Sequence, residues 1–134
     1  MNADAAGDHR HAVLLVEDDH DTREAFTMLA TTVGLDVVAV ENGRVALRRL
    51  RDGGFRPCLI VLDIAMPDMD GLEFRRQQLA DPALADLSVA VMTGGGWAVE
   101  ADARKLGLTV FLRKPVEPDA LLRAFSDHCG AQAG

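Results

Sequence analysis

The chain has 134 residues, of which 49% are hydrophobic and 26% charged, and its formal net charge is −7. This length fits one domain with a sizeable core, and the acidic balance argues against the basic surface that nucleic-acid binding needs. No apolar run approaches the roughly 20 residues of a membrane helix, and residues 1–11 lack the apolar segment of a signal peptide. Cys58 and Cys129 show no metal or redox spacing, so we expect buried thiols in a reducing compartment. Together these properties predict a cytoplasmic globular protein.

Apolar runs alternate with segments of helical periodicity along the chain. Short apolar runs without polar alternation are typical of strands buried on both faces, and they cover residues 12–16, 35–40, 58–62, 87–92 and 109–112. Helices are expected over residues 21–33, 42–50, 71–80, 97–106 and 118–129. Asp21 is expected to cap the first helix, with Glu24 completing a capping box, and Asn42 to cap the second.

Strands that alternate with helices predict an α/β fold, a doubly wound parallel sheet with helices on both faces. Periodicity does not give the order of the strands in that sheet. Residues 1–11 are expected to form a disordered arm, residues 12–129 one domain, and residues 130–134 a frayed tail.

The strands are followed by residues that can hold a metal ion or a phosphoryl group. Glu17 and Asp18 follow the first strand, Asp63 the third and Thr93 the fourth, and Lys114 comes shortly after the fifth. Parallel strands share their carboxyl edge, where open α/β sheets bind ligands. Three carboxylates gathered there repel one another unless a cation lies between them, and hard oxygen ligands suit Mg²⁺. Lys114 offers a positive charge for a phosphate oxygen, and the Asp63 carboxylate is the available nucleophile.

Four sequence segments occur in the order and spacing of a known family. They are LLVEDD at residues 14–19, DIAMPDMDG at 63–71, MT at 92–93 and FLRKP at 111–115. Through them the chain resembles the receiver domain of two-component response regulators, in its single-domain, chemotaxis-regulator-like form. The resemblance covers residues 12–129 and implies a flavodoxin-like sheet of five strands in the order 2-1-3-4-5, with five flanking helices.

The resemblance also assigns roles at the acidic crevice. It makes Asp63 the phosphoacceptor, which takes phosphate from the phosphohistidine of a histidine kinase or phosphotransfer protein. Asp18 and Asp63 are expected to ligate Mg²⁺ directly, Glu17 through water and Ala65 through its backbone carbonyl, and Mn²⁺ can take the same place. Lys114 is expected to pair with the acyl phosphate and to precede a cis peptide bond.

Two further residues are assigned to the conformational response. Thr93 is expected to swing onto a phosphate oxygen, and Phe111 to rotate inward behind it. Phe111 stands where some relatives carry tyrosine, so no hydroxyl reaches the output face. The glycines at 94–96 predict a loosely held loop beside Thr93, which Gly95→Ala should stiffen if the backbone there has negative φ.

The function implied is a stand-alone signalling switch that transfers phosphate to itself and removes it, without acting as an enzyme on other substrates. Its downstream partner is expected on the surface around the strands at 87–92 and 109–112 and the helices that follow them. A phosphate shuttle or sink, or the receiver piece of a hybrid histidine kinase, would use the same fold. A phosphatase with an aspartyl-phosphate intermediate is less favoured, because it needs a second acid where Ala65 stands. A flavin-binding carrier would need a hydroxyl-rich loop after the first strand, which ends in acids.

Overall fold

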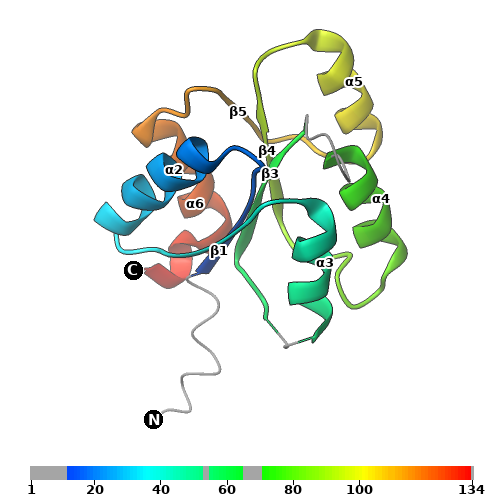
Figure 1. Cartoon of the computed structure of the whole chain (residues 1–134), viewed down its shortest axis with the longest axis horizontal. Coiled ribbons are helices and arrows are strands. Elements are labelled where there is room, and N and C mark those ends of the chain that lie inside the picture. Colours follow the sequence, from blue (N-terminus) through cyan, green and yellow to red (C-terminus); the bar gives the residue numbers. More distant parts are fainter. Residues whose placement is uncertain (1–11, 53–54, 65–70, 134) are drawn as a thin grey trace.

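The protein folds as a five-stranded parallel sheet between two layers of helices (Figure 1). The structure is a computed structural model that describes residues 12–52, 55–64 and 71–133, so the predicted arm at 1–11 lies outside it. The strands are β1 (Ala12–Val16), β2 (Asp36–Val40), β3 (Leu59–Asp63), β4 (Val89–Thr93) and β5 (Phe111–Arg113). The helices are α2 (His20–Thr32), α3 (Gly43–Asp52), α4 (Gly71–Ala80), α5 (Trp97–Lys105) and α6 (Pro118–Ala133). The strand order β2-β1-β3-β4-β5 confirms the order that the family resemblance implies.

The three central strands are buried along their whole length, which explains their uninterrupted apolar sequences. Helices α2 and α6 cover one face of the sheet, and α3, α4 and α5 cover the other (Figure 1). Successive residues of a strand point to opposite faces. Accordingly, Val13 and Leu15 pack against α2 and α6, whereas Leu14 and Val16 pack in the core beneath α3, α4 and α5. Two apolar cores therefore fix the sheet and leave its carboxyl edge for polar groups.

The first helix is capped by Asp19, and the predicted cap at Asp21 is wrong. The Asp19 carboxylate accepts hydrogen bonds from the N–H of Thr22 at 2.9 Å and from its hydroxyl at 2.6 Å. Asp21 falls inside the first turn instead. The predicted capping box fails with it, and Glu24 pairs with His20 one turn earlier, at 3.3 Å. Thr22 decides the cap because it offers Asp19 two donors at the right spacing.

Other element boundaries agree or shift by a few residues. Asn42 caps α3 as predicted, accepting from the N–H of Val45 at 2.9 Å. The fourth strand begins at Val89, because the Leu87 carbonyl accepts a hydrogen bond from Gln78 Nε2 at 3.1 Å in the preceding turn. Helix α6 runs past the predicted end at residue 129, since the alanines and glutamine at 131–133 are compatible with a helix.

The two cysteines form a disulfide bond, so the expectation of free buried thiols is wrong. Cys58 directly precedes β3 and Cys129 lies on α6, and their Cα atoms are 5.4 Å apart although 71 residues separate them in sequence. The packing of α6 across the sheet brings the two together, which sequence spacing does not reveal. Within the described residues, no helix combines the length and apolarity needed to span a bilayer.

Candidate functional site

Three carboxylates meet at the carboxyl edge of β1 and β3, as predicted. Glu17 is held at the sheet edge by its N–H, which donates to the Val40 carbonyl at 3.0 Å. The exposed fraction is 1% for Glu17 and 3% for Asp63, while Asp18 is exposed. One oxygen of each acid lies within 4.8 Å of the others. Two buried acids and one exposed acid thus share a space small enough for a single cation.

Lys114 reaches this space from the segment between β5 and α6. Its N–H donates to the Thr93 carbonyl at 2.9 Å, and the Lys114–Pro115 bond is cis, as predicted. The ammonium nitrogen lies 3.1 Å from Glu17 Oε1 and 3.2 Å from Asp63 Oδ2. The contact with Asp63 is a hydrogen bond, whereas Glu17 Oε1 accepts none from the described residues. The predicted lysine therefore joins the acids, and it neutralises only part of their charge.

The surroundings of Glu17 and Lys114 raise the pKa values of both groups. Burial raises the pKa of Glu17 from 4.5 to about 7, and the nearby charge of Asp63 adds to the rise, although the Asp19 N–H and Lys114 oppose it. Burial would lower the pKa of Lys114, but Glu17 and Asp63 outweigh it and raise that pKa above 10.5. Lys114 is therefore charged at neutral pH, and Glu17 is near its titration midpoint.

A hard divalent cation fits this arrangement. The buried Glu17 Oε1 has no hydrogen bond within the described residues and its charge is met there by the Lys114 ammonium at 3.1 Å, so its remaining lone pairs can accept a cation or water. Asp18 and Asp63 supply further carboxylate oxygens within the same 4.8 Å. Oxygen ligands with room for several waters are what Mg²⁺ requires. The fourth expected ligand, the carbonyl of Ala65, lies outside the described residues.

Thr93 ends β4 at the same edge and holds the start of the glycine loop. Its side chain is 3% exposed, and its hydroxyl oxygen accepts a hydrogen bond from the Gly95 N–H at 3.1 Å. Gly95 and Gly96 have φ values of +110° and +123°, which side chains with a Cβ adopt only under strain. The condition attached to Gly95→Ala therefore fails, and that substitution should strain the loop. The glycines are required by the backbone conformation of this turn.

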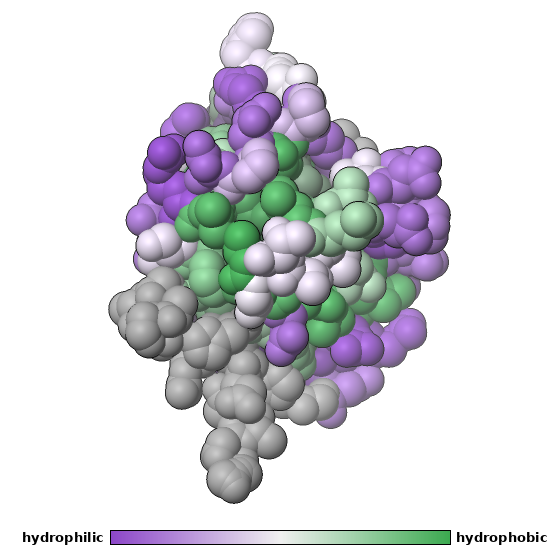
Figure 2. All heavy atoms as spheres, turned by 90° about the vertical axis from the view of Figure 1, so that its left-hand side faces the viewer, coloured by the Kyte–Doolittle hydropathy of each residue, from purple (hydrophilic) through white to green (hydrophobic). Residues whose placement is uncertain are grey.

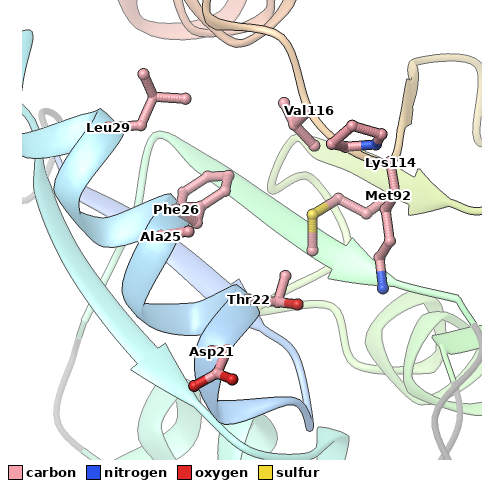
Figure 3. A pocket seen from close by; sticks show the side chains of 9 residues that line it. Asp21, Thr22, Ala25, Phe26, Leu29, Met92, Lys114 and Val116 are labelled. Carbon is pink, nitrogen blue, oxygen red and sulfur yellow. The ribbon is translucent and has the colours of Figure 1, made fainter.

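A hollow opens beside Lys114, between α2 and the segment after β5 (Figure 3). It measures about 490 Å³. Ala25, Phe26 and Leu29 of α2 form one wall, and Val116 stands opposite them (Figure 3). Figure 2 shows apolar side chains gathered over this side of the molecule. An apolar recess thus leads from the surface to the lysine of the acidic site.

Comparison with known proteins identifies the family to which this fold belongs. The sequence model of one protein family, the response regulator receiver domain, matches residues 13–126. The chain belongs to this family. Chemotaxis protein CheY of Listeria monocytogenes is 34% identical over 114 residues, covering 84% of this chain and 92% of the relative.

Two further relatives of this receiver domain differ in the share of their length that the chain covers. The C4-dicarboxylate transport transcriptional regulatory protein DctD of Pseudomonas aeruginosa is 35% identical over 124 residues, which are 91% of this chain and 26% of DctD. The signal receiver domain of a histidine kinase from Syntrophus aciditrophicus superposes with a TM-score of 0.80 at 27% identity, covering 90% of this chain and 91% of that one. The chain thus spans nearly all of the CheY relative but about a quarter of DctD.

Two contacts of this receiver domain join α5 to β5, and sequence reasoning missed both. The guanidinium of Arg104 lies 4.6 Å from the centre of the Phe111 ring, over the aromatic residue expected to rotate. Arg113 forms an ion pair with Glu100, with Nη1 and Oε2 3.3 Å apart, and Glu100 is 9% exposed. Arg113 directly precedes Lys114, and the only signal in the sequence was a basic residue next to the predicted site lysine.

Proposed function

We propose that this receiver domain accepts a phosphoryl group on Asp63 from the phosphohistidine of a histidine kinase or a phosphotransfer protein. One observation carries the proposal: Asp63 is 3% exposed at the end of β3, hydrogen-bonded to Lys114 and within 4.8 Å of two further acids. A carboxylate held among like charges, with a lysine and room for a cation, is suited to binding a phosphoryl group. A structural aspartate needs none of these neighbours.

The transfer breaks one bond and forms one. A carboxylate oxygen of Asp63 attacks the phosphorus of phosphohistidine, the P–N bond breaks, and its electron pair stays on the imidazole nitrogen. Lys114, already 3.2 Å from Asp63 Oδ2, pairs with an oxygen of the incoming phosphoryl group. To end the signal, water attacks the phosphorus of the aspartyl phosphate, which releases inorganic phosphate and restores the Asp63 carboxylate. Both steps act on the protein itself.

Mg²⁺ is the cofactor that this proposal needs, with Mn²⁺ as a substitute. Asp18, Asp63 and Glu17 would hold it. When bound, the cation supplies charge neutralisation for the phosphoryl oxygens. The protein itself keeps Glu17 and Asp63 buried and close together, so that solvent does not screen the charge of a cation held between them.

The conformational response begins at Thr93. Its hydroxyl oxygen accepts a hydrogen bond from Gly95 N–H, and the same hydroxyl can donate its proton to a phosphoryl oxygen. A rotation of Thr93 toward Asp63 would release the loop that this bond holds. Phe111, half-buried below Arg104, would then rotate inward. The response would reach the surface through α5, where Trp97 is 84% exposed.

The proposed partners dock on two adjoining surfaces. The apolar recess between α2 and the segment after β5 adjoins Lys114, so it suits the protein that delivers the phosphoryl group (Figure 3). The downstream protein would contact β4, β5, α5 and α6. Both partners would bind in the cytoplasm.

The wider role is proposed to be that of a stand-alone switch, and the support is that the match covers 92% of the chemotaxis protein CheY of Listeria monocytogenes. A receiver within a hybrid histidine kinase, like the one from Syntrophus aciditrophicus, or a phosphate shuttle would use the same site.

Phosphorylation by a small acyl phosphate in the presence of Mg²⁺ tests the proposal. Intact-mass analysis should show one added phosphoryl group on the wild-type chain and none on Asp63→Asn. Asp36→Asn is the matched control, because Asp36 is an exposed acid at the other end of the sheet, and it should be phosphorylated like the wild type. Equal phosphorylation of Asp63→Asn would overturn the assignment.

A further inference from the structure

The disulfide between Cys58 and Cys129 lies away from the acidic site and has no part in the proposed phosphoryl transfer. Cys58 precedes β3 by one residue, at the end of the strand opposite to Asp63. Asp63 comes five positions after Cys58 along extended chain, which is roughly 16 Å. The cysteine pair is therefore an independent feature of the fold.

The two sulfur atoms differ in how easily a reagent can reach them. Cys129 is 1% exposed and lies on the face of α6 that packs on the sheet, in line with Leu121 and Phe125. Cys58 is only partly buried, and its sulfur lies 3.5 Å from the Ala12 carbonyl oxygen, which can accept a hydrogen bond from a thiol there. Any reagent from solvent should therefore meet Cys58 first.

Both redox states have a place in this structure. Cα atoms 5.4 Å apart allow the bond without movement of the backbone. A reduced Cys129 would remain a small apolar side chain in the core, and a reduced Cys58 would keep its carbonyl partner. Neither state leaves a buried polar group of the pair without a partner. The fold therefore accepts the cysteines either reduced, with the bond open, or oxidised, with the bond closed.

We propose that Cys58 and Cys129 form a reversible redox site that exchanges with low-molecular-weight thiols and disulfides. The inference rests on the proposed function, because signalling from a histidine kinase places the chain in a reducing compartment. Disulfides found in such compartments are mostly transient and redox-sensing. The bond then reports oxidising conditions.

The chemistry balances with a small disulfide as the oxidant. The Cys58 thiolate attacks one sulfur of the small disulfide, forming a mixed disulfide on Cys58 and releasing one small thiolate. The Cys129 thiolate attacks the Cys58 sulfur, closes the protein disulfide and releases the second small thiolate. The protein loses two electrons and two thiol protons, and the small disulfide gains both electrons. Two small thiols reverse the sequence.

The bond controls how firmly the end of α6 is held. Closed, it ties the C-terminal half of α6 to the start of β3, and it bridges 71 residues of chain. Open, the same turns lose this link and keep the packing of residues such as Phe125. Reduction should therefore loosen α6, which forms part of the proposed partner surface, while leaving Asp63 able to accept phosphate.

The test is a titration of the full-length chain in buffers of varied reduced and oxidised glutathione, with trapping of free thiols and mass analysis. We expect conversion between two free thiols and an intramolecular disulfide within the range that glutathione buffers span. Oxidation should slow amide exchange in residues 121–129 by about tenfold more than in α4. It should also raise the melting temperature by on the order of 10 °C.

Two single variants test the order of the steps. Cys129→Ala should accumulate glutathione on Cys58, and Cys58→Ala should take up little, because Cys129 is buried. A disulfide that persists in the most reducing buffer would be a permanent staple and would overturn the inference. Two thiols that persist in the most oxidising buffer, or disulfide-linked dimers, would overturn it as well.

Phosphorylation of the same samples separates this inference from the proposed function. Equal phosphorylation of Asp63 in both redox states, with the expected titration, supports both. The expected glutathione titration without phosphorylation of Asp63 would contradict the proposed function and, with it, the role of the cysteine pair in the cytoplasm. Normal phosphorylation without a titration removes only the redox site.

Discussion

Replacing Lys114 by methionine should destabilise the protein in a way that depends on pH. Lys114 Nζ lies 3.1 Å from Glu17 Oε1 and 3.2 Å from Asp63 Oδ2, and methionine keeps the length of the stem without the charge. Removing one partner of a fully buried ion pair costs about 3–5 kcal/mol. The lysine side chain is 33% exposed, so solvent screening reduces the expected loss at pH 8 to about 2 kcal/mol.

The sign of the pH dependence follows from Glu17. Folding raises the pKa of Glu17 from 4.5 to about 7, so the protonated carboxyl favours the folded state. This contribution to stability is complete below pH 4.5 and is lost as the pH rises to about 7. In the wild type this loss amounts to about 3 kcal/mol, at 1.36 kcal/mol for each unit of pKa. At pH 5 Glu17 is protonated with or without Lys114. The methionine variant should therefore lose less stability at pH 5, about 1 kcal/mol from Asp63 alone.

Urea unfolding followed by far-UV circular dichroism, without metal and at both pH values, measures these differences. Lys105→Met is the matched control, because Lys105 is 78% exposed and pairs with Asp102 only at 3.8 Å. It should change the free energy of unfolding by less than about 0.5 kcal/mol at either pH. Equal losses for the two variants at pH 8, or equal losses for Lys114→Met at pH 5 and pH 8, would refute the electrostatic reasoning.

Three further results are expected. Lys114→Met should bind Mg²⁺ as tightly as the wild type or more tightly by calorimetry, since the ammonium repels the cation; a clear loss of affinity would contradict the site. Gly71→Ala should lose roughly 1–3 kcal/mol in urea unfolding, because a Cβ there lies 2.7 Å from the Ile64 Cα and 2.8 Å from the Asp63 carbonyl oxygen; a neutral result would mean that the contact yields. Gly95→Ala should lower the melting temperature, because φ is +110° there, whereas Gly94→Ala, which has open space and no positive φ, should leave it equal or higher. Equal shifts for these two glycine variants would show that the backbone at Gly95 is not strained.

The strands and the acidic site could be predicted because their signals are local. Strands buried on both faces need continuous apolar runs, and β1 and β3 have them directly before Glu17 and Asp63. Parallel strands then bring these acids together whatever the details of the helices. The order of the strands needed the family resemblance, since periodicity says which face a residue lies on and nothing about which strand is its neighbour.

The features that were missed depend on tertiary packing or on competition between similar residues. Asp19 and Asp21 are both good capping residues, and only the donors of Thr22 decide between them. The disulfide joins residues separated by 71 positions, so no local sequence pattern predicts that Cys129 pairs with Cys58. The positive φ of the glycine loop likewise follows from the turn that the loop makes, which the sequence GGG leaves open.

The most direct test of the central claim is the chemical location of the phosphoryl group. The chain is treated with an acyl phosphate and Mg²⁺, quenched, and reduced with borohydride, which converts an aspartyl phosphate to homoserine. Peptide mapping should then find homoserine at position 63 alone, and none when Mg²⁺ is removed by a chelator. Homoserine at Asp18 or at another acid, or an unmodified Asp63 in a chain that has gained a phosphoryl group, would contradict the account.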